Sequence, residues 1–338
     1  MAVRNAYYLL MVLTISTFFK ISTRVEAIGV CYGTIADNLP PPPEVVALFK
    51  SNQIDSMRIY SPNHDILAAL AGGIALTIGT FNSEVQAMAA DPAAAQGWVA
   101  ANILPYVNTV NFRYINVGNE IIPDALAPFI LPAMTNVQNA LVASGVTTIK
   151  VSTSIASNVL GPSFPPSNGH FTPEAEAILS PILQFLAAHG APLLINIYPY
   201  YAYRGNPENV RLDYALFNAT GVVEQDGQLG YQNLFDAMVD SIVAAMEKVG
   251  AGNVGLVVSE SGWPSNGAFG ASADNARVHN QNLIDHVGKG TPRRPGVPLE
   301  TYLFAMFNEN QKGPAELEKF YGLFFPDKTP VYPIRFVA

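Results

Sequence analysis

The sequence predicts a single (β/α)8 TIM barrel, an α/β fold with its active-site groove at the C-terminal ends of the strands. Three observations lead to this prediction. Short apolar, β-branched runs alternate with longer helical segments, which indicates a parallel sheet. Eight such strand–helix units fit into about 310 residues, a usual size for such a barrel. No Gly-x-Gly-x-x-Gly follows any strand run, which argues against an open nucleotide-binding sheet.

Eight segments have the composition of buried strands. In chain order they are Ile28–Tyr32, Ser56–Tyr60, Ala75–Gly79, Tyr114–Val117, Ile149–Thr153, Leu193–Tyr198, Val254–Ser259 and Tyr302–Phe307. The segments between them have the length and apolar spacing of helices: Pro43–Ser51, His64–Leu70, Ser83–Ala89 with Pro92–Tyr106, Ala127–Ala143, Pro173–His189, Tyr231–Val249 and Ser272–Gly288, with a short Pro314–Phe320 after the last strand. Ser83, Asp91 and Thr172 are expected helix caps.

Residues 1–27 are predicted to be a secretory signal peptide, which leaves residues 28–338 as one folded domain. Arg4 precedes an apolar stretch from Ala6 to Phe19, and Val25-Glu26-Ala27 offers small residues for cleavage. The alternative is a membrane anchor, because charged residues flank the apolar run on both sides. The run is shorter than a membrane span requires, so we favour the removed leader.

The charge and the cysteine count exclude several classes of partner and chemistry. The formal net charge is −8, which argues against nucleic acid or an anionic membrane as a partner. It does not oppose a neutral polysaccharide, and a monomer is expected. Cys31 is the one cysteine, and its apolar neighbours predict a buried, inert thiol. The five histidines are scattered without a His-Glu-x-x-His pattern, so neither a metal nor a cofactor is expected.

Two glutamates end apolar runs that are predicted to be strands. Glu120 closes the run that begins at Tyr114, and Glu260 closes the run that begins at Leu256. A carboxylate there is costly unless it has polar partners or a task. Since the C-terminal ends of barrel strands meet at one mouth, both carboxylates are expected to face one cleft. Glu120 alone could equally be a satisfied polar residue at a strand end, whereas Glu260, between two valines and Gly262-Trp263-Pro264, is harder to explain in this way. Such a pair is typical of glycoside hydrolases.

Aromatic, amide and charged side chains gather at the same predicted face. Aromatic rings offer flat apolar faces to sugars, and amides offer hydrogen bonds to hydroxyls. The candidates for substrate binding are Tyr60, Asn119, Asn196, Tyr198, Trp263, Phe307, Glu309 and Lys312. Taken singly, each ring fits the core or the rim as well as a ligand contact. Glu309 is expected to bind hydroxyls, or to pair with Lys312 and tune the catalytic carboxylates. The alternative is that it forms only a surface ion pair.

Several segments match one family in the same order along the chain. They are Ile28–Gly33, Asn116–Glu120, Asn196–Tyr200, Gln225–Gly227 and, most strongly, Val257–Ser265 and Phe304–Lys312. On these residues the chain resembles the plant β-1,3-glucanases, glycoside hydrolase family 17, over all of residues 28–338. The resemblance implies a (β/α)8 catalytic domain that hydrolyses internal linkages of β-1,3-glucans, such as callose, laminarin and fungal wall glucan, with retention of configuration.

The resemblance also implies residue roles. By position, Glu120 corresponds to the general acid/base and Glu260 to the nucleophile, while Glu309, Lys312 and Glu318 correspond to supporting positions around the site. The negative charge of Glu260 is then expected to raise the pKa of Glu120 and to keep it protonated at mildly acidic pH.

Alternatives within and outside the enzyme class stay open. Related barrels cut mixed-linkage β-1,3-1,4-glucans or transfer glycosyl groups, and a non-catalytic glucan-binding barrel is the more remote interpretation. The acidic pI of ≈5.1 and the short chain end after Phe336 favour export to the apoplast and cell wall over the vacuole. Plant defence and callose turnover both agree with the family.

Overall fold

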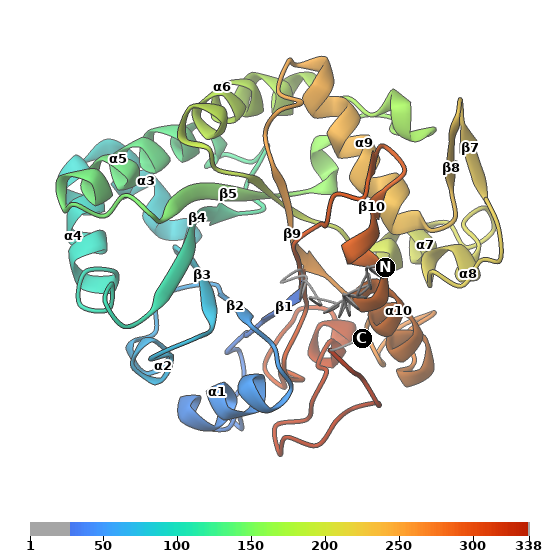
Figure 1. The fold of residues 1–338 in the computed structure, drawn as a ribbon, viewed down its shortest axis with the longest axis horizontal. Coiled ribbons are helices and arrows are strands. Elements are labelled where there is room, and N and C mark those ends of the chain that lie inside the picture. Colours follow the sequence, from blue (N-terminus) through green and yellow to red (C-terminus); the bar gives the residue numbers. More distant parts are fainter. Residues whose placement is uncertain (1–27, 337–338) are drawn as a thin grey trace, which may run out of the picture.

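Eight parallel strands close into a barrel at the centre of the molecule (Figure 1). This computed structural model describes residues 28–336, so the predicted leader lies outside the described residues. The strands are β1 (Ile28–Cys31), β2 (Ser56–Ile59), β3 (Ala75–Gly79), β4 (Asn111–Asn119), β5 (Lys150–Ala156), β6 (Leu193–Asn196), β9 (Leu256–Ser261) and β12 (Thr301–Leu303). Each pairs with the next, and β12 pairs back with β1. The predicted TIM barrel is confirmed.

The strands are buried on both faces because helices cover the outside and side chains fill the inside. Every residue of β2, β6 and β12 is buried. This explains why the strands read as continuous apolar runs rather than alternating ones. All eight predicted strands are present, with shifted ends. β4 starts three residues before the predicted Tyr114, and β12 stops at Leu303 rather than at Phe307.

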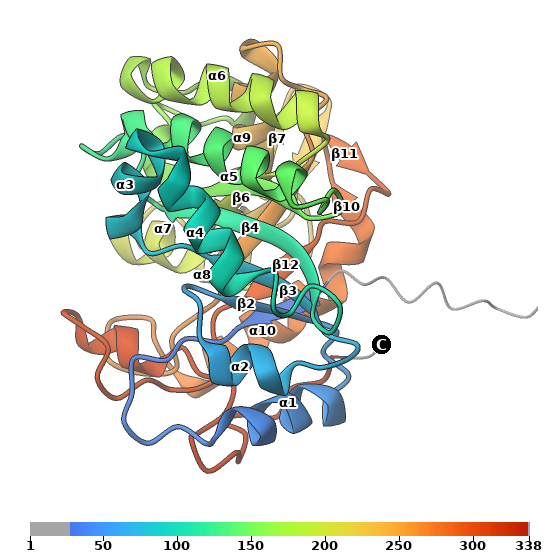
Figure 2. The same cartoon turned by 90° about the vertical axis from the view of Figure 1, so that its left-hand side faces the viewer.

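The helices lie outside the barrel between successive strands. They are α1 (Pro42–Ser51), α2 (His64–Ala69), α3 (Val85–Ala90), α4 (Pro92–Asn102), α5 (Ile130–Ala143), α6 (Pro173–His189), α9 (Leu234–Lys248) and α10 (Ala273–His286). Both α3 and α4 pack on α5, and α6 follows beside it (Figure 2). Asp91 and Thr172 cap α4 and α6 as predicted. Ser83 caps no helix and lies inside a 3-10 turn, Asn82–Glu84. The predicted Pro314–Phe320 helix is a 3-10 helix, Glu316–Phe320.

Several short elements were not predicted from the sequence. The helices α7 (Pro199–Gly205) and α8 (Leu212–Ala215) follow β6, and the hairpin of β7 (Glu224–Asp226) and β8 (Leu229–Tyr231) projects at the right-hand edge of Figure 1. A second hairpin, β10 (Gly290–Thr291) with β11 (Arg294–Pro295), precedes β12. Three or fewer residues per strand give no periodic signal. Among residues 28–336, no helix has the length and apolarity to cross a membrane.

Burial shifts the pKa of Cys31 and of His279, whose side chains are both fully buried. Cys31 lies inside the barrel, where burial raises the pKa of its thiol to about 12, so the predicted inert cysteine is confirmed. His279 of α10 packs against Trp263 and Phe217, with its Nδ1 3.0 Å from the carbonyl oxygen of Ala215. Burial lowers the pKa of His279 to about 4, so this imidazole is neutral at ordinary pH.

Candidate active site

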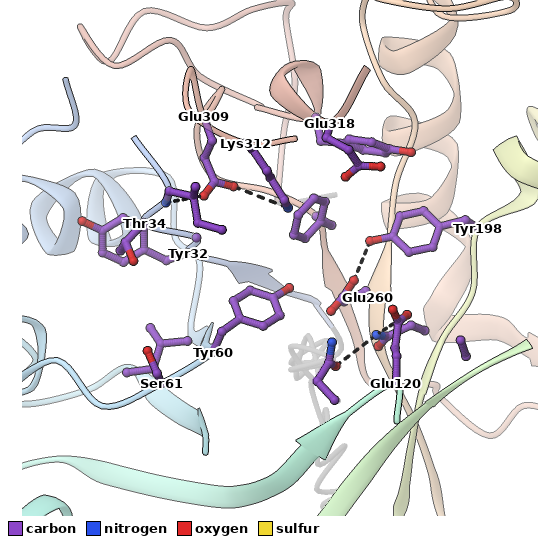
Figure 3. A pocket seen from close by; sticks show the side chains of 18 of the residues that line it. Tyr32, Thr34, Tyr60, Ser61, Glu120, Tyr198, Glu260, Glu309, Lys312 and Glu318 are labelled. Atoms are coloured by element: carbon purple, nitrogen blue, oxygen red, sulfur yellow. Dashed lines mark hydrogen bonds and ion pairs between the residues drawn. The ribbon is translucent and has the colours of Figure 1, made fainter. Parts of the chain in front are cut away.

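A cleft of about 980 Å³ opens at the C-terminal ends of the strands. All eight barrel strands, or the loops that follow them, contribute to its lining. Figure 3 shows Glu120 and Glu260 on one side of this cleft, with Glu309, Lys312 and Glu318 opposite. The predicted meeting of the two glutamates in one cleft is therefore what the structure shows. The barrel brings them together although they are 140 positions apart in the sequence.

Glu260 is a carboxylate that is held at both oxygens. It lies in β9, where it is buried, and its Oε1 accepts a hydrogen bond from Nη1 of Arg58 at 3.0 Å in an ion pair. Its Oε2 accepts a hydrogen bond from the Tyr198 hydroxyl at 2.7 Å. Burial, and next the charge of Glu260, raise the pKa of Tyr198 well above its usual value, so the phenol stays a donor. The result is a fixed, charged oxygen pair that faces the cleft.

Glu120 has the opposite electrostatic setting. Its Oε1 accepts a hydrogen bond from Nδ2 of Asn196 at 2.9 Å, and it has no direct cation contact within the described residues. Burial, followed by the negative charge of Glu260, raises the pKa of Glu120 from 4.5 to about 6, against the lowering effects of Asn196 and Arg58. One carboxyl is thus a proton donor at mildly acidic pH while its neighbour is ion-paired, which is the usual division between acid and nucleophile.

The backbone at Glu120 is strained and is held from both sides, by the 3-10 turn that contains Asn82 and by strand β5. Glu120 has φ +57°, a left-handed conformation that is uncommon outside glycine. Asn82 clamps the preceding residue: its Nδ2 donates to the Asn119 carbonyl at 3.0 Å, and its Oδ1 accepts from the Asn119 amide at 2.8 Å. On the other side, the Glu120 amide donates to the Ser154 carbonyl at 3.0 Å. These contacts fix the direction in which the Glu120 side chain leaves the strand.

Arg58 is the centre of the polar network beneath the cleft. This fully buried side chain donates to Glu260, to Asn119 Oδ1 at 2.6 Å and to Asn196 Oδ1 at 3.2 Å, and also to the Ser259 carbonyl and the Ser154 hydroxyl. Sequence analysis missed both Arg58 and Asn82. A signal for Arg58 exists, because an arginine inside an apolar strand requires a buried acid as its partner. For Asn82 the signal is weaker: an amide shortly after a strand, on the catalytic face.

Most of the predicted binding residues line the cleft. They are Tyr60, Asn119, Asn196, Tyr198, Glu309, Lys312 and the supporting acid Glu318.

The surface ion-pair interpretation of Glu309 is wrong, because Glu309 is only 3% exposed and its Oε1 accepts from the amide of Ile35 at 2.8 Å. A Cβ at Gly33 would lie 2.4 Å from this carboxylate, so any side chain there would displace it. Lys312 Nζ lies 3.7 Å from Glu309 and 3.7 Å from the ring centre of Phe304.

Two predicted sugar platforms are wrong. Trp263 is fully buried, with its indole N–H donating to the Gly270 carbonyl at 2.9 Å, and Phe307 is 2% exposed with its ring edge-on to Tyr32. Neither residue lines the cleft. Burial of a large ring stabilises the fold most, and the Trp263 ring packs behind α7 against Tyr200, Tyr203 and His279. Trp263 therefore stabilises the loop that follows β9 and does not contact the substrate.

Within residues 28–336, no three His, Cys, Asp or Glu side chains gather in a way that could hold a metal ion. The polar side chains that line the cleft are carboxyls, amides, phenols, aliphatic hydroxyls and one ammonium. This set matches the needs of acid/base and nucleophilic chemistry on a hydroxyl-rich substrate.

Comparisons with known proteins agree with this geometry. Residues 28–336 match the model of glycosyl hydrolases family 17. A glucan endo-1,3-beta-glucosidase of Vitis vinifera is 52% identical over 322 residues, which cover 94% of this chain and 93% of that protein. Lichenase-2 of Hordeum vulgare is 53% identical over 313 residues, 92% of this chain and 99% of that protein.

Among solved structures, one of two plant beta-glucan endohydrolases described as having distinct substrate specificities superimposes with a TM-score of 0.88. It is 53% identical, and the match covers 91% of this chain and all of that one. A match of a family model over nearly the whole described chain, together with relatives that are identical at about half of their positions, defines the family. The chain therefore belongs to glycosyl hydrolases family 17.

Proposed function

We propose that this protein is a retaining endo-β-1,3-glucanase. The observation that carries the proposal is the pair of carboxyls in one cleft with opposite settings: Glu260 ion-paired to Arg58, and Glu120 with its pKa raised to about 6. One acid and one nucleophile facing the same substrate are what a double displacement at a glycosidic bond requires. The relatives named as glucan endo-1,3-beta-glucosidases support the choice of β-1,3-glucan as substrate.

The reaction then follows two steps. Glu260 attacks the anomeric carbon and forms a covalent glycosyl-enzyme, while the protonated Glu120 donates its proton to the departing glycosidic oxygen. Glu120, now ionised, removes a proton from the incoming water, which releases the sugar and restores both carboxyls. Arg58 and Tyr198 hold the two oxygens of Glu260 and so fix the direction of attack.

The polar groups around the pair can bind sugar hydroxyls. Asn119 uses its Oδ1 to accept hydrogen bonds from Arg58 and Asn196, and its Nδ2 makes no hydrogen bond to residues 28–336, so it can donate to the substrate. The Tyr60 ring also lines the cleft, but its hydroxyl oxygen is buried and faces the Cys31 thiol, so Tyr60 can offer the substrate its ring rather than its hydroxyl. Asn119 Nδ2 is therefore the donor suited to a hydroxyl next to the reacting carbon.

A reducing-sugar assay on purified protein with linear β-1,3-glucan tests the activity. The variant Glu260→Gln should lose turnover while it still binds glucan, because the amide keeps the shape of the carboxylate without its nucleophilicity. NMR spectra of the first products should show the β-anomer before mutarotation. Normal hydrolysis by the Glu260→Gln variant, or an α-anomeric first product, would refute the assignment.

Mixed-linkage glucan is the second candidate substrate, because Lichenase-2 is as similar to this chain as the glucan endo-1,3-beta-glucosidases are. Both activities use the same carboxyl pair, so the two glutamates do not distinguish them. Parallel assays on laminarin and on barley β-1,3-1,4-glucan do. Product analysis by mass also separates hydrolysis from glycosyl transfer, since transfer yields oligosaccharides longer than the substrate.

We further propose that the protein is secreted to the cell wall space as a monomer. The leader-like pattern of residues 1–27 and the acidic pI of ≈5.1 support this. Expression in plant cells with fractionation, followed by sequencing of the mature N-terminus, is expected to give apoplastic protein that begins near Ile28. Gel filtration with light scattering measures the oligomeric state.

A further inference from the structure

An exposed aromatic ring lies at the end of a stack that starts in the core. Phe269 is 60% exposed, and its ring packs nearly parallel on that of Tyr203, with centroids 5.7 Å apart and an angle of 21°. Tyr203 in turn packs on Trp263 at 5.8 Å, and Trp263 is fully buried. The inner face of the Phe269 ring is therefore covered, which leaves the outer side of the ring toward solvent.

The backbone that carries this ring is held rigidly. The Phe269 carbonyl accepts a hydrogen bond from the Tyr200 hydroxyl at 3.1 Å. The next carbonyl, that of Gly270, accepts two more, from the Trp263 indole and from Asn275 Nδ2, each at 2.9 Å. Gly270 has φ +76°, and a Cβ there would lie 2.7 Å from the Tyr203 ring. Because the loop and the stack beneath it are fixed before binding, the ring loses little conformational entropy when a ligand packs on it.

The loop that carries the ring packs beside one end of the catalytic cleft. Helix α7, labelled in Figure 1, carries both Tyr203 beneath Phe269 and Tyr201, which lines the cleft. The Tyr201 hydroxyl donates to Glu318 at 2.7 Å, and its ring packs edge-on against Tyr198 at 5.6 Å. The loop that holds Phe269 also rests on the 3-10 helix of Glu318, since the Ser265 amide donates to the Phe320 carbonyl at 2.8 Å. Phe269 thus lies next to the Tyr201–Glu318 end of the cleft, outside its lining.

We propose that Phe269 is a binding platform for a glucosyl unit of a long β-glucan chain that extends past Tyr201 and Glu318. This rests on the proposed function and adds a contact outside the catalytic cleft. The C–H face of a β-linked glucosyl ring matches a flat apolar ring, and the neutral ligand needs no charge partner. Because the contact is remote from the reacting bond, it strengthens the binding of long chains and leaves the chemical step alone.

The test compares Phe269→Ala and Phe269→Trp with the unmodified protein on polymeric linear β-1,3-glucan and on laminaripentaose. For Phe269→Ala, KM for the polymer should rise about three- to tenfold, the range of one aromatic contact, with kcat and the pentaose values unchanged. Phe269→Trp should leave KM for the polymer unchanged or lower it, because tryptophan keeps a flat aromatic face. Phe269→Leu, which keeps apolar bulk without a flat ring, should behave like the alanine variant.

The matched control is Phe164→Ala. Phe164 is 73% exposed, and no other ring of residues 28–336 stacks on it, so its loss removes an exposed phenylalanine without a backing stack. It should leave KM for the polymer unchanged. An unchanged polymer KM in Phe269→Ala would overturn the proposal. An equal rise in KM on the polymer and the pentaose, together with a lower melting temperature, would also overturn it, because that result indicates a structural role. If the unmodified protein cleaves no β-glucan at all, the proposed function fails first, and polymer retardation on glucan gels still tests Phe269 in binding.

Discussion

The titration of Glu120 offers the sharpest test of the electrostatics. Burial is the first cause of the rise in its pKa from 4.5 to about 6, and the charge of Glu260 is the second. Glu260→Gln removes that charge and keeps the shape of the side chain. The pKa of Glu120 should then fall below 6 but stay above 4.5, because the burial contribution stays. In the unmodified enzyme, kcat should fall about fivefold between pH 6 and pH 7 as the acid, whose pKa is about 6, loses its proton.

The measurement is the ¹³C chemical shift of the Glu120 carboxyl in protein labelled at glutamate, assigned by its loss in Glu120→Gln. Glu318→Gln is the matched control, since it also removes one negative charge from the cleft. Of the named causes, the charge of Glu318 contributes least to the pKa of Glu120. It should lower the pKa of Glu120 by less than Glu260→Gln does. A Glu120 that titrates near 4.5 in the unmodified protein, or one that is unaffected by Glu260→Gln, would refute the reasoning.

The same titration has a consequence for stability. A raised pKa means that between pH 4.5 and about 6 the folded state holds a proton that the unfolded chain releases. The stabilising contribution is therefore complete below pH 4.5 and is lost as the pH rises through 6. The full rise corresponds to about 2 kcal/mol. Because the residue is partly exposed to solvent, screening reduces this to about 1 kcal/mol, which Glu120→Gln should remove from the pH dependence of urea unfolding.

Three further perturbations follow from the site and the core. Arg58→Met leaves Glu260 buried without a cation, so we expect a loss of about 3–5 kcal/mol in unfolding free energy and of most turnover, whereas Arg58→Lys keeps the charge and loses fewer contacts. Asn82→Ala should lower kcat and change KM little, because it removes the hydrogen bonds that hold the strained backbone at Glu120. The control Asn136→Ala, which removes hydrogen bonds to the carbonyls of Met88 and Ala89, should lower only the melting temperature, and equal kcat values for the two would contradict the clamp. Between pH 6.5 and 4 the unfolded chain binds a proton at His279 that the buried imidazole does not bind, which lowers the unfolding free energy by about 3 kcal/mol. His279→Gln should remove this part of the pH dependence. An unchanged pH dependence in urea titrations would rule this out.

The barrel and its two glutamates were predictable because they leave local signals. A buried parallel strand is a continuous apolar run, and an acid at its end breaks the run visibly, as at Glu260. Asp91 and Thr172 were predictable as caps for the same reason, since each stands directly before a proline that starts a helix. Such features depend on residues that are neighbours in the chain.

The direction in which a ring points depends on residues that are far away in the chain. Trp263 and Phe307 follow strands just as Tyr198 does, yet only Tyr198 lines the cleft. Tyr200 and Tyr203 of α7 fill the space behind Trp263, and α7 was not predicted from the sequence. Phe269 shows the reverse error: as a single phenylalanine in a loop it gave no signal, and the stack beneath it is visible only in three dimensions.

The ring of strands is closed by its first and last members. Ile28, Gly29 and Val30 of β1 pair with Thr301, Tyr302 and Leu303 of β12, some 270 positions later. Synthesis must therefore reach β12 before the sheet can close, and until then the partial barrel has unpaired strand edges. Loss of Ile28, Gly29 and Val30 would remove the β1 residues that pair with β12. Losses past position 27 should therefore open the barrel, whereas N-terminal extensions leave this pairing in place.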